Sequence, residues 1–173
     1  MRKLYFLPVL AVTLMAAGCD DDSPTEPSEI VPTFSMGLLA SNEVPAVTGA
    51  ELSCTGNVTI KLNLTRDAAQ AITAATVDFT ANISGCPTST NITAAHIHEG
   101  PAGQATGVVV NTGITSGAVP LTNGAGSFTR NGINVTNLSI IQRMLDNPIG
   151  FYFNIHSTAN PGGVIRAQLV RTQ

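Results

Sequence analysis

The chain has 173 residues, of which 43% are hydrophobic and only 11% are charged, and this length suits one domain of the usual size, roughly 100 to 150 residues. Its formal net charge is −3, and six Lys and Arg remain once Arg2 and Lys3 near the N-terminus are set aside, too few to form a basic stripe along a run of phosphates. Composition therefore excludes nucleic acid as an expected partner, and the abundance of Thr, Asn, Ser and Gly favours an all-β class.

Residues 1–18 have the pattern of a secretory signal peptide. Two basic residues precede an apolar run from Leu4 to Ala17, after which come small residues. A run this short is typical of a cleaved signal rather than of a membrane span. "MAAGC" then resembles the lipobox of bacterial lipoproteins, which predicts that Cys19 carries a lipid anchor. An ordinary signal peptide followed by a free Cys19 is the alternative.

Residues 19–33 are expected to be a lipidated cysteine followed by a disordered tether. The stretch "DDDSPTEPSEIVPT" is acidic and Pro-rich, with almost nothing apolar to bury. A single domain is then predicted over residues 34–173. Its expected location is the bacterial cell envelope, outside the cytoplasmic membrane and held to a membrane by the lipid.

Cys54 and Cys86 are the two cysteines that remain after Cys19. Because export places them in an oxidising compartment, an even pair most simply forms one disulfide. Closing a loop of about 33 residues stabilises a fold by roughly 3 to 4 kcal/mol in the chain-entropy model. The alternative is a pair of thiolate metal ligands, but further ligands are not nearby in sequence.

Eight stretches with strand-like alternation or composition follow one another along the domain, with turn residues between them. They are residues 33–40, 52–64, 72–83, 92–99, 107–113, 124–130, 150–157 and 163–171. Between the sixth and seventh stretches, Leu138, Ile141 and Leu145 recur at helical spacing before Pro148, which predicts one short helix. About eight strands with one such crossover indicate a β-sandwich or a flattened barrel.

The chain has three histidines, and two of them lie one residue apart. Residues i and i+2 of a strand point to the same side, so His96 and His98 are expected to share a face. The third, His156, lies in the seventh stretch, which a short Asn-Pro-Gly turn joins to the eighth as an antiparallel hairpin. If both apolar faces meet the core, register parity places five polar-face residues on one surface: Tyr152, Asn154, His156, Arg166 and Gln168. Alternation alone does not place His96 beside this hairpin.

Three segments resemble motifs of the CHRD domain family, in the order of that family. They are "LLASNEVPAV" (38–47), "AAHIHEGPAGQATGVVV" (94–110) and "FYFNIHSTANPGGVIRAQL" (151–169). The resemblance implies an immunoglobulin-like or related β-sandwich and an extracytoplasmic role. Because the family has no established general activity, the expected function is that of a binding or structural module whose ligand or protein partner is open.

A metal site is the alternative function. "HIHEG" is similar to the His-X-His-Glu strand of copper/zinc superoxide dismutases, although this chain has too few histidines for the complete dismutase site. If His156 lies beside His96 and His98, three imidazoles can bind Cu or Zn with an open fourth position. Glu99 would then supply an oxygen ligand, or accept a hydrogen bond from one of the metal-binding imidazoles.

Arg166 argues against a simple cation site, since a guanidinium cannot ligate a metal and repels a bound cation unless a carboxylate intervenes. Glu43 is a possible partner for it. The competing interpretation is a buried polar network in which these two residues and the histidines satisfy one another. An organic or anionic ligand held by Arg166 and Tyr152 is a third. No catalytic residue is nominated, because Ser157 points away from His156 and no Gly-X-Ser-X-Gly elbow exists.

Overall fold

The computed structural model describes residues 30–173, so the predicted signal peptide, Cys19 and most of the tether lie outside the described residues. Eight strands occur in this range: β1 (Thr33–Leu39), β2 (Thr55–Arg66), β3 (Ile72–Ser84), β4 (Ile92–Glu99), β5 (Val108–Asn111), β6 (Gly126–Asn134), β7 (Phe151–Ser157) and β8 (Ile165–Gln168). One α-helix, α1 (Leu138–Asp146), and three short 3₁₀ helices, η1 (Ala40–Asn42), η2 (Ala50–Ser53) and η3 (Pro148–Gly150), complete the described part. The all-β class, the number of strands and the short helix are as predicted.

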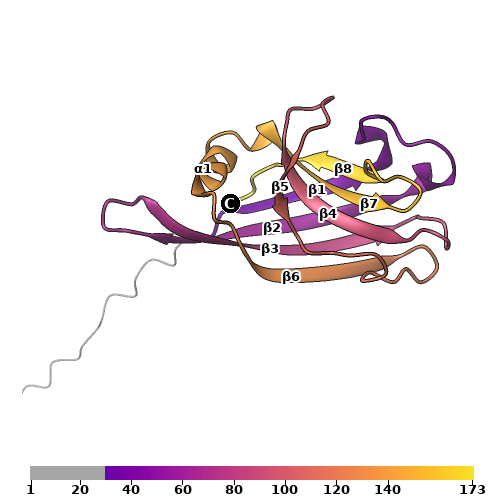
Figure 1. Ribbon diagram of the computed structural model, residues 1–173, viewed down its shortest axis with the longest axis horizontal. Coiled ribbons are helices and arrows are strands. Elements are labelled where there is room, and N and C mark those ends of the chain that lie inside the picture. Colours follow the sequence, from indigo (N-terminus) through magenta and orange to yellow (C-terminus); the bar gives the residue numbers. More distant parts are fainter. Residues whose placement is uncertain (1–29) are drawn as a thin grey trace, which may run out of the picture.

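The eight strands belong to one antiparallel sheet, in the order β5-β4-β7-β8-β1-β2-β3-β6 (Figure 1). β1 pairs with β2 along its whole length and with β8 at Leu39 and Arg166, and so it joins the two halves of the sheet. The sheet curls around one core, in which Phe79 of β3 stacks on Phe153 of β7 with ring centroids 5.9 Å apart.

The β-sandwich that the family resemblance implied is therefore corrected to one barrel-like, nearly closed sheet, which is closer to the flattened barrel that the strand pattern left open. The physical reason is that alternation of apolar and polar residues is the same in a sandwich strand and in a barrel strand. Only the pairing between β1 and β8 distinguishes the two architectures here.

The core is built from the alternating apolar faces of the strands. In β2, Val58, Ile60 and Leu62 are each at most 1% exposed, while Lys61 and Asn63 between and beyond them face solvent. Burying a side chain of this size stabilises the fold by roughly 1.5 to 3 kcal/mol. The alternation of β2 thus directs its apolar face inward, as its sequence predicts.

Helix α1 packs its buried Ile141 and Met144 toward the barrel, next to β3 (Figure 1). It ends before Pro148, which begins η3 and cannot continue an α-helix. No helix within residues 30–173 is long and apolar enough to cross a membrane.

Cys54 and Cys86 form a disulfide, as predicted. Cys54 directly follows η2, and Cys86 lies two residues beyond the end of β3. The bond therefore ties the segment that leads into β2 to the segment that leaves β3.

Candidate functional site

β4 lies directly beside β7, and this pairing brings the three histidines together. His96 is opposite Asn154, His98 is opposite Tyr152, and Ala94 is opposite His156. β8 continues the arrangement on the other side of β7, where Arg166 is opposite Asn154 and Gln168 is opposite Tyr152. Since the intervening apolar residues of these strands are buried in the core, the polar residues share the outer face of the sheet.

Three loops cover this outer face. The carbonyl oxygen of Thr106, in the loop after β4, contacts His98, and that of Pro161, in the turn after β7, contacts His156. Near the end of η1, the Asn42 amide donates to the Arg166 carbonyl at 3.1 Å. The three sequence segments 38–47, 94–110 and 151–169 therefore meet at one place. Burial follows, with His98 5% and Arg166 1% exposed.

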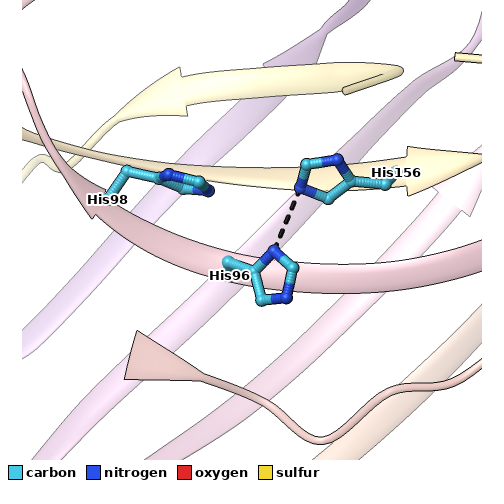
Figure 2. A group of neighbouring side chains, drawn as sticks. All are labelled: His96, His98 and His156. Atoms are coloured by element: carbon cyan, nitrogen blue, oxygen red, sulfur yellow. Dashed lines mark hydrogen bonds between the residues drawn. The ribbon is translucent and has the colours of Figure 1, made fainter. Parts of the chain in front are cut away.

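The three imidazoles converge from two strands, as Figure 2 shows. His96 Nδ1 lies 3.1 Å from His156 Nε2, and one ring nitrogen from each of the three histidines lies within 4.8 Å of the others. A tetrahedral ion with bonds of about 2 Å holds its ligands about 3.3 Å apart. Ring movements on the order of 1 Å therefore suffice to close the group around an ion.

Backbone carbonyls set the tautomers of two of these rings. His98 Nδ1 lies 2.8 Å from Thr106 O, and His156 Nδ1 lies 2.9 Å from Pro161 O. A carbonyl only accepts hydrogen bonds, so both Nδ1 atoms carry the proton in the neutral rings, and both Nε2 atoms present a lone pair. His98 Nε2 is buried and has no hydrogen-bond partner among residues 30–173.

All three histidines are held in the neutral state. Burial lowers the pKa of His96 to about 4, and the neighbouring His156 and His98 lower it further in the same direction. Burial also lowers the pKa of His98 and of His156. Neutral imidazole is the form that binds metal ions, so at neutral pH the group needs to lose no proton from a cationic ring.

Tyr152 separates the histidines from Arg166. The His98 ring stacks on the Tyr152 ring at a centroid distance of 4.6 Å and an interplanar angle of 3°. The guanidinium carbon of Arg166 lies 3.3 Å from the Tyr152 centroid. Because both groups approach this closely, they occupy opposite faces of the ring. The Tyr152 hydroxyl oxygen accepts from Thr106 N–H at 3.0 Å, which holds the covering loop in place.

Glu43 lies in this buried region without forming an ion pair with Arg166. The guanidinium donates to Pro101 O at 3.3 Å and to Gln168 Oε1 at 3.2 Å instead. Glu43 is 5% exposed, and its Oε1 has no partner in the described part of the chain. Burial raises the pKa of the Glu43 carboxyl to about 7, although the Arg166 charge acts in the opposite direction.

Gln168 and Asn154 hold backbone at the edges of the site. Gln168 Nε2 lies within hydrogen-bond distance of three carbonyl oxygens, those of Gly100, Ile149 and Phe151, and its two N–H groups are shared among them. Asn154 Nδ2 contacts the Gly162 carbonyl at 3.4 Å, while its Oδ1 has no partner within residues 30–173. Both side chains therefore fasten loops over the outer face rather than join the imidazole group.

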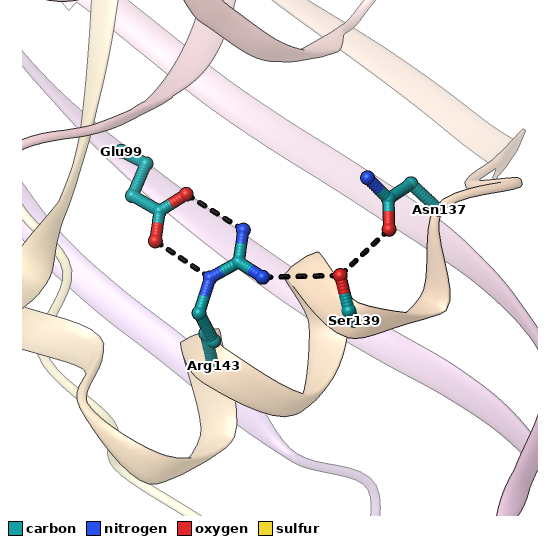
Figure 3. A network of polar contacts seen from close by, with 4 residues as sticks. All are labelled: Glu99, Asn137, Ser139 and Arg143. Carbon is teal, nitrogen blue, oxygen red and sulfur yellow. Dashed lines mark hydrogen bonds and ion pairs between the residues drawn. The ribbon is translucent and has the colours of Figure 1, made fainter.

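Glu99 is placed away from the histidines. As the residue after His98 it points to the opposite side of β4, where its carboxylate accepts from Arg143 Nε at 2.7 Å and from Arg143 Nη2 at 2.8 Å. Figure 3 shows Arg143 on α1 facing the Glu99 carboxylate, together with the Ser139 hydroxyl that accepts from Arg143. The expected role of Glu99 as a ligand or acceptor at the imidazole group does not fit this placement.

No sequence pattern predicts the two backbone carbonyls that set the histidine tautomers. Pro161 lies in an Asn-Pro-Gly turn, so its turn was recognisable but its contact was not. Thr106 carries no signal at all, because every residue has a backbone carbonyl. Gly163 is also part of the site, since a side chain there would collide with the Glu43 carboxylate.

Comparison with known proteins gives one match. The model of the CHRD domain family matches residues 34–169, which is most of the chain and nearly all of the described part. Neither the curated proteins nor the solved structures contain a significant match. The matched range includes all three histidines and the loops that cover them.

Proposed function

This chain belongs to the CHRD domain family, and from that premise we propose that it is an extracytoplasmic binding module that holds one copper or zinc ion. His98 Nε2, His156 Nε2 and His96 Nδ1 are the ligands, the last after the His96 proton moves from Nδ1 to Nε2, and a water or another small molecule takes the fourth position. The family and the disulfide both fit an extracytoplasmic protein.

The observation that carries the proposal is the pair of Nδ1–H to carbonyl contacts at His98 and His156. A metal-binding histidine almost always donates its other ring N–H to a carbonyl or carboxylate, which fixes the ring and leaves the ligating nitrogen free. Here the free Nε2 of His98 is already buried without a partner. An orphaned lone pair costs free energy unless an ion or a proton satisfies it.

Arg166 is compatible with a cation at this place. Its charge is in contact with the Tyr152 ring, on the face opposite to His98. The Glu43 carboxyl supplies a compensating negative charge in the same buried region when it is ionised. The positive charge of Arg166 favours this ionised form, because it acts to lower the pKa of Glu43. Copper and zinc are favoured over magnesium or calcium because the donor set is nitrogen alone.

A buried polar network is the second candidate function, and one observation favours it. His96 Nδ1 donates to His156 Nε2 at 3.1 Å, so two of the three rings already satisfy each other without an ion. In this case the three histidines would stabilise the covering loops and bind nothing.

Metal analysis of the purified protein separates the two candidates. We expect one copper or zinc ion per chain and a loss of at least 100-fold in affinity for His98→Ala, measured by calorimetric titration of each metal. Glu99→Gln is the matched control, since it alters the neighbouring residue on the opposite face and should retain wild-type affinity. Wild-type protein that takes up no stoichiometric metal, together with a destabilised His98→Ala variant, would establish the network instead.

Anchoring to a bacterial membrane through Cys19 is part of the proposal and rests on the "MAAGC" sequence. Mass spectrometry of the mature N-terminus is the test. A diacylglyceryl group on Cys19 is expected, and an unmodified cysteine in the processed protein would refute the anchor.

A further inference from the structure

The turn that joins β7 to β8 determines the state of His156. Its Pro161 carbonyl accepts from His156 Nδ1 at 2.9 Å, and this bond leaves Nε2 as the lone-pair atom that faces His96. If the carbonyl moved, the ring would lose the partner that selects its tautomer. The position of this turn is therefore as important as that of the histidine itself.

A buried carboxylate from a distant part of the chain holds this turn. Glu51 is 6% exposed, and its Oε2 accepts from the Ser157 hydroxyl at 2.5 Å and from the Asn160 amide at 2.6 Å. The Ser157 hydroxyl oxygen in turn accepts from Asn160 N–H at 2.9 Å. Both ends of the turn thus donate to the same carboxylate oxygen. Ser157 directly follows His156, and Asn160 directly precedes Pro161.

Glu51 is itself fastened to the barrel. It lies in η2, whose next residue, Cys54, is bonded to Cys86. The Ser53 hydroxyl adds a hydrogen bond of 2.6 Å to the Gly85 carbonyl. The disulfide and this hydrogen bond fix η2 to the segment after β3, so the backbone that carries Glu51 is held in place.

We propose that Glu51 is a positioning residue of the histidine site, which holds the Pro161 carbonyl against His156 Nδ1 and is anchored for this task by the Cys54–Cys86 disulfide. The expected effect of Glu51 on metal affinity rests on the proposed function, whereas the expected effect of Glu51 on the His156 tautomer does not. Glu51 touches no imidazole and acts only through the turn.

The size of the effect follows from what outer contacts do at metal sites. Loss of a residue that orients a ligand typically costs 10- to 100-fold in metal affinity. Because Glu51 acts through one further link, a change of about 10-fold is expected. Charge-assisted hydrogen bonds to a carboxylate are stronger than neutral ones, so an amide at this position should restore much but not all of the effect.

The test uses Glu51→Leu, which removes the acceptor, and Glu51→Gln, which retains one acceptor oxygen. Nitrogen-15 NMR of the histidine rings in the metal-free protein reads the tautomers directly. In Glu51→Leu we expect His156 to change from a single Nδ1–H form to a mixture while His98 is unchanged. Affinity for copper or zinc should fall about 10-fold and recover largely in Glu51→Gln.

A control of similar instability separates positioning from general loss of structure. Val135→Ala removes buried apolar volume between β6 and α1, in a segment that contributes no residue to the site or to the turn, and should leave the His156 tautomer unchanged. If Glu51→Leu does not fold, Asn160→Ala removes one of the two donors to Glu51 and should produce a smaller shift of the same kind.

The outcomes distinguish this inference from the proposed function. A His156 tautomer that is identical in wild type, Glu51→Leu and Asn160→Ala would overturn the positioning role, whatever the metal affinity. A tautomer change in protein whose wild type binds no metal would support the positioning role and refute the metal site.

Discussion

At the scale of single residues, the buried ionisable groups have opposite preferences for protons. The folded protein lowers the pKa of His96 from its usual value of 6.5 to about 4, so this ring stays neutral in moderately acidic solution. It raises the pKa of the Glu43 carboxyl from its usual value of 4.5 to about 7, so this group stays protonated in mildly acidic solution. Burial is the main cause in both cases, because it disfavours whichever form is charged. The two kinds of group therefore respond to pH with opposite signs.

This opposition predicts how stability depends on pH. Between about pH 4 and 6.5 the unfolded chain binds more protons at His96 than the folded protein does. The lowered pKa values of His98 and His156 act in the same direction, so the contribution of the histidines to the free energy of unfolding rises with pH. Between about pH 4.5 and 7 the folded protein binds more protons at Glu43, so that contribution falls with pH. With three groups against one, we expect a net rise from pH 4.5 to 6.5.

Urea unfolding at several pH values checks this expectation. Glu43→Gln removes the falling contribution and should make the rise steeper, whereas His96→Gln removes a rising one and should make it shallower. Equal slopes in wild type and Glu43→Gln would show that the Glu43 carboxyl titrates normally in the folded protein.

At the scale of elements, the turn between β7 and β8 positions His156 through the Pro161 carbonyl, although the three imidazoles lie on β4 and β7. Glu51 holds it through Ser157 and Asn160, and Glu43 lies against its Gly163. Gly163 has a φ of +139°, which L residues rarely adopt. A turn held from two sides by buried carboxylates presents its carbonyl to His156 in one defined position.

Substitution of Gly163 tests this account of the turn. Gly163→Ala should lower the free energy of unfolding by about 2 kcal/mol or more, because the new methyl group meets the Glu43 carboxylate and the backbone angle is strained. Gly162→Ala is the matched control, since a Cβ there meets nothing within 4 Å. Thermal unfolding of both variants measures the difference, and equal stability would contradict the close packing of Glu43.

At the scale of the whole molecule, one sheet closes around the core and its two halves meet at β1 and β8. Leu39 pairs with Arg166 at one end of this junction, and the antiparallel bridge between Phe34 and Arg171 continues it beyond the end of β8. The disulfide lies close to this register pair, because Thr55, the residue after Cys54, pairs with Leu39, and it ties the entry to β2 to the exit from β3. A protein with a limited core gains from such a covalent link, since it restricts the unfolded chain.

Removal of the disulfide should therefore have a large effect on stability. For Cys54→Ala with Cys86→Ala we expect the free energy of unfolding to fall by about 3 kcal/mol and the melting temperature by roughly 10 °C. Calorimetry under oxidising conditions is the measurement. A change under about 1 kcal/mol would mean that the closed loop is already ordered in the unfolded chain.

Much of the fold was predictable because strand periodicity is local. The alternation in residues 58–64 correctly predicted the buried face of β2, and the spacing of Leu138, Ile141 and Leu145 predicted α1. The same reasoning placed His96 and His98 on one face of their strand and Tyr152, Asn154 and Arg166 on one shared surface of the hairpin, in agreement with the register of β7 with β8. The disulfide followed from counting cysteines in an exported chain.

What local periodicity cannot encode is which strands become neighbours. The pairing of β4 with β7 brings together imidazoles 60 residues apart in sequence, and the pairing of β1 with β8 makes one sheet where two were expected. Glu99 has its partner on a helix 44 residues away. The sequence by itself determined the strands, their faces and the residues available for a site. Only the tertiary structure decided which strands lie side by side and which tautomer each histidine ring adopts. The reason is that hydrogen bonds between distant strands and to backbone carbonyls depend on position in space rather than on residue type.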